Sequence, residues 1–186
     1  VIYLGVDQRF RRLSDSEVAL VKQKYHLDFP FVLYIGNLAK HKNITMLIRA
    51  FRDIRKDDSL CKLVISGMKR WKYKEIFEAV DKLGLKESVI FTGYIPDEDL
   101  PALYNAATLF VYPSLYEGFG LPILEAMACG CPVIASNTSS LPEVVGDAGI
   151  LVDPNDVGAL SKAMNDVISN DYLREDLMRR GMERAR

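Results

Sequence analysis

The stretch EGFGLPILE, residues 117–125, predicts a loop that runs directly into a helix. Pro122 suits the first position of that helix, where its missing N–H leaves no hydrogen bond unmade. Gly118 and Gly120 allow the preceding loop to turn its backbone N–H groups toward a ligand. Those N–H groups and the helix dipole together form an anion site.

A carboxylate lies at each end of this stretch. One glutamate near a helix start is explained simply by the helix dipole, which favours acidic residues there. Here, however, Glu125 is expected about one turn inside the helix and Glu117 just before it, so that an anion at the helix end would lie between them. Ionised carboxylates accept hydrogen bonds from hydroxyl groups. The residues therefore favour a ligand in which a sugar is attached to a phosphate.

Short runs of β-branched and aromatic residues precede and follow this loop, and they alternate with segments of helical period. Strand-then-helix repetition at this spacing predicts right-handed crossovers and a Rossmann-like, doubly wound parallel sheet of the α/β class. Such sheets bind ligands beyond the carboxyl ends of their strands, at the switch point. The expected strands are Phe31–Ile35, Lys62–Ser66, Val89–Thr92, Leu109–Tyr112, Val133–Ala135 and Ile150–Val152.

Apolar residues between these strands recur at steps of three and four, which marks the buried faces of helices. Gly84 is expected to end the second helix and Asp97 to cap the third. Trp71 is expected to pack at a helix start. The faces are Ile44, Leu47, Ile48, Phe51 and Ile54; Ile76, Val80 and Leu83; Leu100, Leu103 and Tyr104; and a helical tail with Ala159, Ala163, Val167, Leu173 and Leu177.

Composition excludes several classes of protein. The chain of 186 residues fits one domain, and its net charge of −1 gives no general attraction to nucleic acid or anionic lipid. No apolar run approaches membrane-spanning length, and the N-terminus lacks the pattern of a signal peptide. The three cysteines, Cys61, Cys129 and Cys131, lie in apolar contexts and predict buried thiols in a reducing compartment.

The 117–125 stretch matches the E-x7-E signature of the retaining GT-B glycosyltransferases of the large group 1 (family 4) type. Residues 126–136 and 141–149 resemble the next two segments of that family, in order and at normal spacing. Residues 1–7 resemble the segment that enters the second domain of these enzymes. The resemblance implies that residues 1–186 are one domain, the C-terminal donor-binding half of a GT-B fold, and that the acceptor-binding N-terminal domain lies outside this chain.

The loop GNLAKHKN, residues 36–43, follows the first expected strand and opens a helix. It fits neither the dinucleotide-binding pattern G-x-G-x-x-G nor a Walker loop, so a dehydrogenase loses its main support. The loop is similar to the Gly-Arg-Leu…Lys element of the family, in which Arg and Lys neutralise the donor diphosphate. Lys42 falls on the family Lys, whereas Asn37 replaces the Arg with an uncharged amide. Lys40 and His41 are both candidates to compensate.

The resemblance implies a role for each part of the site. The leaving diphosphate is stabilised by Lys42, Asn37 and the amides of Gly120 and Leu121. The implied catalytic residues are Lys42 and Glu117. Glu117 holds donor-sugar hydroxyls and Glu125 the ribose hydroxyls, and neither is a covalent nucleophile. The loops with Gly67 and Tyr94 hold the base, although Gly67 and Gly93 fit simple strand-end turns equally well. The implied donor site is Gly36, Asn37, Lys42, Gly67, Met68, Tyr94, Ile95, Glu117, Gly118, Phe119, Gly120, Leu121 and Glu125.

No cofactor is implied beyond the nucleotide-sugar donor. Asp97, Glu98 and Asp99 invite a metal, but acids are favoured at a helix start and a third ligand is not evident, so no metal site is predicted. The sequence of residues 89–100 and 136–140 resembles that of mannosyl- and rhamnosyltransferases of surface-polysaccharide assembly, which favours GDP-mannose as donor.

The implied acceptor is a glycan or a lipid-linked glycan, reached through the other domain. The expected location is the cytoplasm, with peripheral membrane attachment through that other domain only. Two alternatives stay open: a GT-B sugar-nucleotide epimerase, and a non-catalytic module that binds a nucleotide sugar and regulates a partner. The epimerase should not carry the complete 117–125 stretch.

Overall fold

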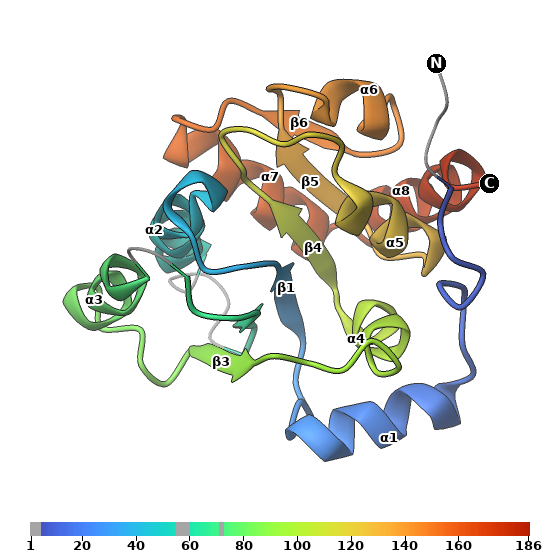
Figure 1. The fold of residues 1–186 in the computed structure, drawn as a ribbon, viewed down its shortest axis with the longest axis horizontal. Helices are drawn as coiled ribbons and strands as arrows, with labels where there is room; N and C mark the ends of the chain where they lie inside the picture. The colour runs from blue at the N-terminus through green and yellow to red at the C-terminus, as the bar shows by residue number, and fades with distance from the viewer. Residues whose placement is uncertain (1–4, 55–59, 71–72) are drawn as a thin grey trace.

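The fold is one six-stranded, all-parallel sheet covered by helices on both faces, as the sequence predicts (Figure 1). The computed structural model describes residues 5–54, 60–70 and 73–186; Trp71 lies outside these residues, as do the first four residues of the 1–7 segment. The strand order is β3-β2-β1-β4-β5-β6. The strands are β1 Phe31–Ile35, β2 Lys62–Ser66, β3 Val89–Gly93, β4 Leu109–Tyr112, β5 Val133–Ser136 and β6 Ile150–Val152.

Two helical layers cover the sheet. In Figure 1, α2, α3 and α7 lie on one side, and α1, α4, α5 and α8 lie on the other. The strand order reverses between β1 and β4, so the switch point lies at the carboxyl ends of these two neighbours. The helices are α1 Asp15–Tyr25, η1 Lys40–Lys42 (a single 3-10 turn), α2 Ile44–Ile54, α3 Lys74–Lys82, α4 Leu100–Ala106, α5 Leu121–Ala128, α6 Leu141–Val145, α7 Val157–Ser169 and α8 Asp171–Arg184.

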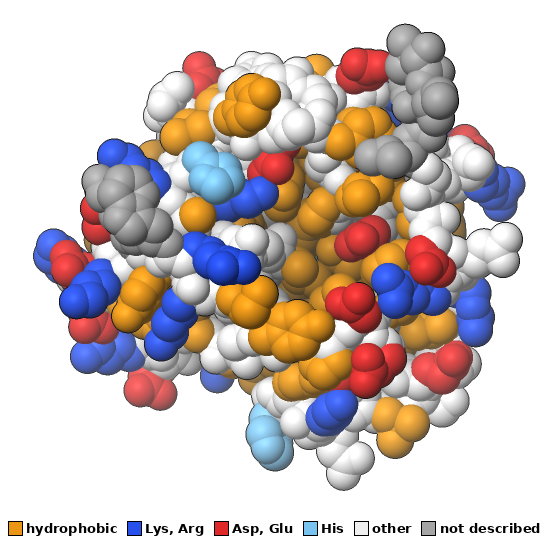
Figure 2. All heavy atoms as spheres, in the orientation of Figure 1, with side chains coloured by type: hydrophobic (Ala, Val, Ile, Leu, Met, Phe, Trp, Pro, Cys, Tyr) orange, Lys and Arg blue, Asp and Glu red, His pale blue; other side chains and the backbone are white. Residues whose placement is uncertain are grey.

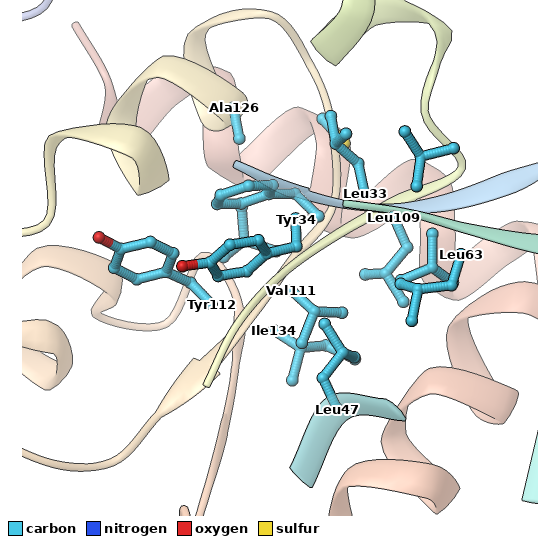
Figure 3. Close-up of a cluster of buried hydrophobic side chains, with 14 of the residues drawn as sticks. Leu33, Tyr34, Leu47, Leu63, Leu109, Val111, Tyr112, Ala126 and Ile134 are labelled. Atoms are coloured by element: carbon cyan, nitrogen blue, oxygen red, sulfur yellow. The ribbon is translucent and has the colours of Figure 1, made fainter. Parts of the chain in front are cut away.

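The central strands are buried on both faces, which is why they read as continuous apolar runs rather than as an alternation. Val111 of β4 and Ile134 of β5 lie toward Leu47 of α2, whereas Tyr112 lies toward the face on which Ala126 of α5 is found (Figure 3). All five side chains are at most 2% exposed. The three cysteines are buried in the same core, as predicted.

Several predicted helix details need correction. Asp97 does not cap the third helix: α4 begins at Leu100, and residues 97–99 form a separate turn in which the Asp99 amide donates to the Pro96 carbonyl at 3.0 Å. This turn is fixed from outside, because the Asp99 carboxylate accepts hydrogen bonds from Lys24 and Tyr25 of α1 at 2.6 Å each.

The predicted helical tail consists of two helices, α7 and α8. Asn170 adopts an extended conformation between α7 and α8, and its side chain accepts a hydrogen bond from the Leu173 amide at 3.0 Å. Asn is favoured at such a cap, so it starts a new helix here. Gly84, with φ +69°, follows the end of α3 as predicted. Helices α1 and α6 were not predicted, although Ser14 and Glu17 form a capping box before α1.

Candidate active site

The loops after β1, β2 and β3 are joined edge to edge by backbone hydrogen bonds. The Gly36 amide donates to the Ser66 carbonyl at 3.0 Å, and the Gly67 amide donates to the Gly93 carbonyl at 2.8 Å. A β-carbon on Gly67 would lie 1.9 Å from the Gly36 carbonyl oxygen, so no other residue fits there. Gly67 is therefore required by the chain itself, which supports the strand-end reading of this glycine.

The loop after β1 places Lys42 beside the end of β4. Residues 40–42 form a single 3-10 turn, after which Asn43 adopts a left-handed conformation with φ 56°. The Asn43 side chain donates to the Pro154 carbonyl at 2.7 Å, which anchors the turn to the loop before α7. The turn is therefore held against this loop, and the Lys42 side chain reaches Tyr112 at the end of β4.

Lys42 and Glu117, the predicted catalytic pair, are in direct contact. The Lys42 ammonium donates a hydrogen bond to the Glu117 carboxylate and a second to the Tyr112 hydroxyl, the latter at 2.9 Å. Both charged side chains are only 12% exposed. An ammonium carries three N–H donors, so one remains for a ligand. Tyr112 was not anticipated from the sequence.

The 117–121 loop is held by two serines that precede α6. The Ser139 hydroxyl donates to the Glu117 carbonyl at 2.5 Å, and the Ser140 hydroxyl donates to the Phe119 carbonyl at 2.9 Å. Ser139 has φ 58°, an uncommon conformation for a residue with a side chain. Sequence reasoning missed both serines, which were noted only as part of the 136–140 segment.

The start of α5 is open to an anion. Gly120 has φ +106°, and α5 begins at Leu121, so that Pro122 is its second residue rather than its first. Within the described part of the chain, no residue accepts a hydrogen bond from the amide of Gly120 or Leu121. The space around Gly118 is open, because a β-carbon there would meet nothing within 4 Å. Its lack of a side chain leaves open space beside Glu117.

Glu125 projects from α5 against a buried tyrosine. The Tyr104 hydroxyl of α4 donates to the Glu125 carboxylate at 3.0 Å. Burial raises the pKa of Glu125 above its ordinary value, while the Tyr104 hydrogen bond and the Arg9 guanidinium oppose that rise and Asp97 adds to it. The surroundings of Glu125 therefore differ from those of Glu117, which contacts Lys42.

A hollow of about 480 Å³ lies at the ends of β2 and β3 and contains most of the predicted base-binding residues. Phe77 and Phe91 stack at its wall with ring centroids 4.2 Å apart. Met68 and Tyr94 line it and are 46% and 61% exposed. Ile95 differs, since its side chain is 2% exposed and lies in the core. The hollow has the size of a small-ligand pocket.

Asn37 lines a separate hollow together with Lys40, His41 and Arg70. Arg70 follows β2, and its amide donates to the Leu38 carbonyl at 3.2 Å, which brings the two loops together. Sequence reasoning weighed only Lys40 and His41 as replacements for the family Arg. Arg70 is a third candidate beside Asn37, and of the three it alone carries a guanidinium group.

The face that carries these groups is hollowed at its centre (Figure 2). The floor of the depression is apolar, and both basic and acidic side chains lie around its rim. Another hollow of about 480 Å³ lies between Val6, Phe119 and Arg184, but neither Lys42 nor Glu117 lines it. Among the described residues, no three potential metal ligands cluster together, and no helix is long and apolar enough to cross a membrane.

A parallel sheet with a cation, two carboxylates and a helix start at its switch point has the arrangement of a nucleotide-binding α/β domain. Comparison with known families gives a match to "Glycosyl transferases group 1" over residues 17–184. The chain belongs to this family.

Three similar proteins illustrate the match. O-antigen chain mannosyltransferase B of Escherichia coli is 47% identical over 176 residues, which are 93% of this chain and 46% of that protein. The GDP-mannose-dependent alpha-(1-6)-phosphatidylinositol monomannoside mannosyltransferase of Mycolicibacterium smegmatis is 36% identical over 180 residues, 89% of this chain and 46% of that protein. The crystal structure of Anabaena HepE in complex with UDP superposes with a TM-score of 0.90 at 26% identity, and covers 100% of this chain and 52% of that one.

The family and the Rossmann-like GT-B fold expected from the sequence are thereby confirmed. The chain spans about half the length of the curated relatives that it matches.

Proposed function

We propose that this chain is the donor-binding domain of a retaining, metal-independent glycosyltransferase that moves mannose from GDP-mannose to a glycan or lipid-linked acceptor. The observation that carries the proposal is the contact between Lys42 and Glu117 at the switch point. It places the group expected to meet phosphate within hydrogen-bond distance of the group expected to hold the sugar. The rest of the protein would supply the acceptor site.

In this proposal the donor lies across the carboxyl edge of the sheet. The base occupies the hollow beside Met68 and Tyr94, and Glu125 accepts hydrogen bonds from the ribose hydroxyls. The diphosphate meets the third N–H of Lys42 and the amides of Gly120 and Leu121. Lys42 is held by Tyr112 and Glu117, and donors positioned by the chain in this way are the ones that stabilise a leaving group effectively.

The charge available at the site supports the proposal of metal independence. Glycosyl transfer leaves negative charge on the diphosphate while the anomeric carbon gains positive charge. Lys42 and the start of α5 supply positive potential. Asn37 carries no charge, and we assign the role of the second positive charge to Arg70, which lines the same hollow. Glu117, positioned on the sugar side, holds hydroxyl groups and forms no covalent bond.

Mannose and GDP are favoured by the names of the relatives. Both curated relatives described above are mannosyltransferases, and one is named as dependent on GDP-mannose. The structural relative that holds UDP is less similar in sequence, at 26% identity. The base-binding loops set this choice through their backbone shape, so it requires a direct test.

The test is calorimetric titration of the chain with GDP, UDP, dTDP and ADP, each in EDTA and again with magnesium. Tight binding of GDP in EDTA is expected, with weaker binding of the other three. Binding that requires magnesium would contradict metal independence, and preference for another base would contradict GDP-mannose. With the full-length protein, NMR of the product from GDP-α-mannose should show an α linkage, since an inverted linkage would exclude a retaining enzyme.

A further inference from the structure

We propose that a buried row of aromatic side chains positions the donor-binding groups, with Tyr112 and Tyr104 as positioning residues for the phosphate and ribose contacts respectively. The inference rests on the proposed function and adds residues that the family signature does not contain. It starts from the aromatic side chains beneath the site, which form one continuous row of neighbouring rings.

The row runs from the N-terminal segment to the centre of the sheet. Phe10 packs on Tyr104 with ring centroids 6.0 Å apart, and Tyr104 packs edge-on against Phe110 at 5.3 Å. Phe110 lies beside Tyr112 at 5.8 Å, and Tyr112 stacks on Tyr34 at 6.2 Å with an interplanar angle of 16°. Each of the five rings is at most 5% exposed. Well-packed aromatic rings of this kind have little freedom to move.

The hydroxyl groups in the row each contact a different part of the site. Tyr104 donates to Glu125 at 3.0 Å, and Tyr112 accepts from Lys42 at 2.9 Å. Tyr34 donates to the Asn37 carbonyl at 3.3 Å. Figure 3 shows the Tyr34 and Tyr112 rings side by side with their hydroxyl groups pointing the same way. The row therefore contacts Glu125, Lys42 and the loop after β1 that carries Asn37.

Packing alone does not explain these hydroxyls. Phe10 and Phe110 fill the same row without one, and a buried hydroxyl is unfavourable unless it is hydrogen-bonded. Gly36 also accommodates Tyr34, because a β-carbon at that glycine would lie 2.8 Å from the Tyr34 hydroxyl oxygen. Hydroxyls occur in the row where a donor-binding group is within reach, which is the pattern expected of a support for the site.

Tyr112 acts on the direction of the Lys42 ammonium. The ammonium is 2.9 Å from the hydroxyl oxygen but 5.1 Å from the ring centroid, so it lies at the hydroxyl end and not over the ring face. Burial raises the pKa of Tyr112, with the Glu117 carboxylate adding to the effect, so the hydroxyl stays neutral. With Tyr112 and Glu117 each accepting one N–H, the third N–H of Lys42 has a fixed direction.

The test replaces single tyrosines by phenylalanine, which keeps the ring and removes only the hydroxyl. Tyr25→Phe is the matched control, since the Tyr25 hydroxyl also donates to a carboxylate, Asp99, but outside the site. GDP is titrated by calorimetry and guanosine by NMR, with UDP and uridine as the second pair. Melting temperatures are measured for every variant, and Lys42→Ala is made alone and together with Tyr112→Phe.

Tyr112→Phe should weaken GDP binding about three- to tenfold and guanosine binding less than twofold, because a hydrogen bond to a charged group is lost beside the diphosphate. Tyr104→Phe should weaken both ligands by similar factors, since it supports the ribose contact. In the Lys42→Ala background, Tyr112→Phe should cause no further loss. Tyr25→Phe should leave both affinities unchanged.

Equal losses for GDP and guanosine in Tyr112→Phe, or full additivity with Lys42→Ala, would show a structural role only and overturn the inference. GDP affinities for Tyr104→Phe and Tyr112→Phe equal to that of Tyr25→Phe would also overturn it, while leaving the proposed function intact. A wild-type chain that binds neither GDP nor UDP would overturn both proposals together.

Discussion

Lys42 and Glu117 are bound to each other, although they come from loops 75 residues apart in the chain. Both side chains are largely buried, so each charge is compensated locally rather than by solvent. In the proposed function, a diphosphate bound by Lys42 therefore shares the ammonium with Glu117. Sugar hydroxyls that approach Glu117 compete with Lys42 in the same way, which makes the two contacts interdependent.

Lys42→Ala should weaken GDP binding far more than guanosine binding. A hydrogen bond to a charged group is worth about 1.5–3 kcal/mol, which corresponds to roughly a ten- to hundredfold loss of affinity. Calorimetry with GDP and NMR titration with guanosine measure the two effects. Equal losses for both ligands would mean that Lys42 is structural.

Glu117→Gln and Glu125→Gln should differ in the ligand that they affect. Glu117 is proposed to contact the sugar and not the nucleotide, and the amide oxygen of a glutamine can still accept the Lys42 N–H. Glu117→Gln should therefore keep GDP affinity within about twofold and weaken GDP-mannose more, because a carboxylate hydrogen bond is stronger than an amide one. Glu125→Gln should weaken GDP and GDP-mannose alike. Each variant is the control for the other, and identical binding profiles would break the assignment.

The pH dependence of nucleotide binding should report on Glu125. Burial raises the pKa of Glu125 above its ordinary value of 4.5, so the ionised form that accepts ribose hydrogen bonds is reached only at higher pH. Guanosine affinity, which is free of phosphate titration, should therefore rise with pH above 4.5 and level off beyond the raised pKa. Glu125→Gln should remove this rise.

The stability of the chain should change with the opposite sign over the same range. Because the folded chain holds the Glu125 proton more tightly than the unfolded chain, its stability should be greater below the ordinary value of 4.5 and fall as pH rises toward the raised pKa. The difference in melting temperature between the wild type and Glu125→Gln isolates this contribution. A difference that does not vary with pH would contradict it.

Gly67→Ala should strongly destabilise the chain, whereas Gly118→Ala should not. The new β-carbon at position 67 would lie 1.9 Å from the Gly36 carbonyl oxygen, and the one at position 118 would meet nothing within 4 Å. Forced overpacking costs about 1–3 kcal/mol or more, which lowers the melting temperature of a domain of this size by roughly 2–4 °C per kcal/mol. Thermal unfolding of the two variants gives the comparison directly.

Arg70→Ala should weaken GDP binding about three- to tenfold at low salt, less than Lys42→Ala does, because an exposed charge is screened by solvent. Arg70→Lys should recover only part of the loss, since ammonium lacks the fork of a guanidinium. Arg49→Ala, which removes an exposed arginine on α2 outside this hollow, is the control. A salt-independent effect, or an equal effect in Arg49→Ala, would exclude Arg70 from the phosphate site.

The strands were predictable because central parallel strands are continuous apolar runs, and the six predicted runs match the six strands to within one residue at either end. The start of α4 was not, because the turn before it is fixed by Lys24 and Tyr25 of a helix 74 or 75 residues away. The contact of Tyr112 with the site could not be predicted for the same reason. Its sequence position indicates only a buried strand residue, and its contact with Lys42 spans 70 residues.

The position of β1 between β2 and β4 has a consequence for how the site comes into being. Val32 pairs with Leu63 on one side and with Leu109 on the other, so the second pairing closes a chain segment more than twice as long as the first. Non-local pairings of this kind form slowly and late. The hollow beside Met68 and Tyr94 borders β2 and β3. The contact of Lys42 with Glu117 forms only once β4 has paired with β1, because Glu117 lies in the loop after β4. In the proposed function, a partly folded chain would bind a base without binding a diphosphate. The appearance of GDP affinity during refolding would then report the pairing of β1 with β4.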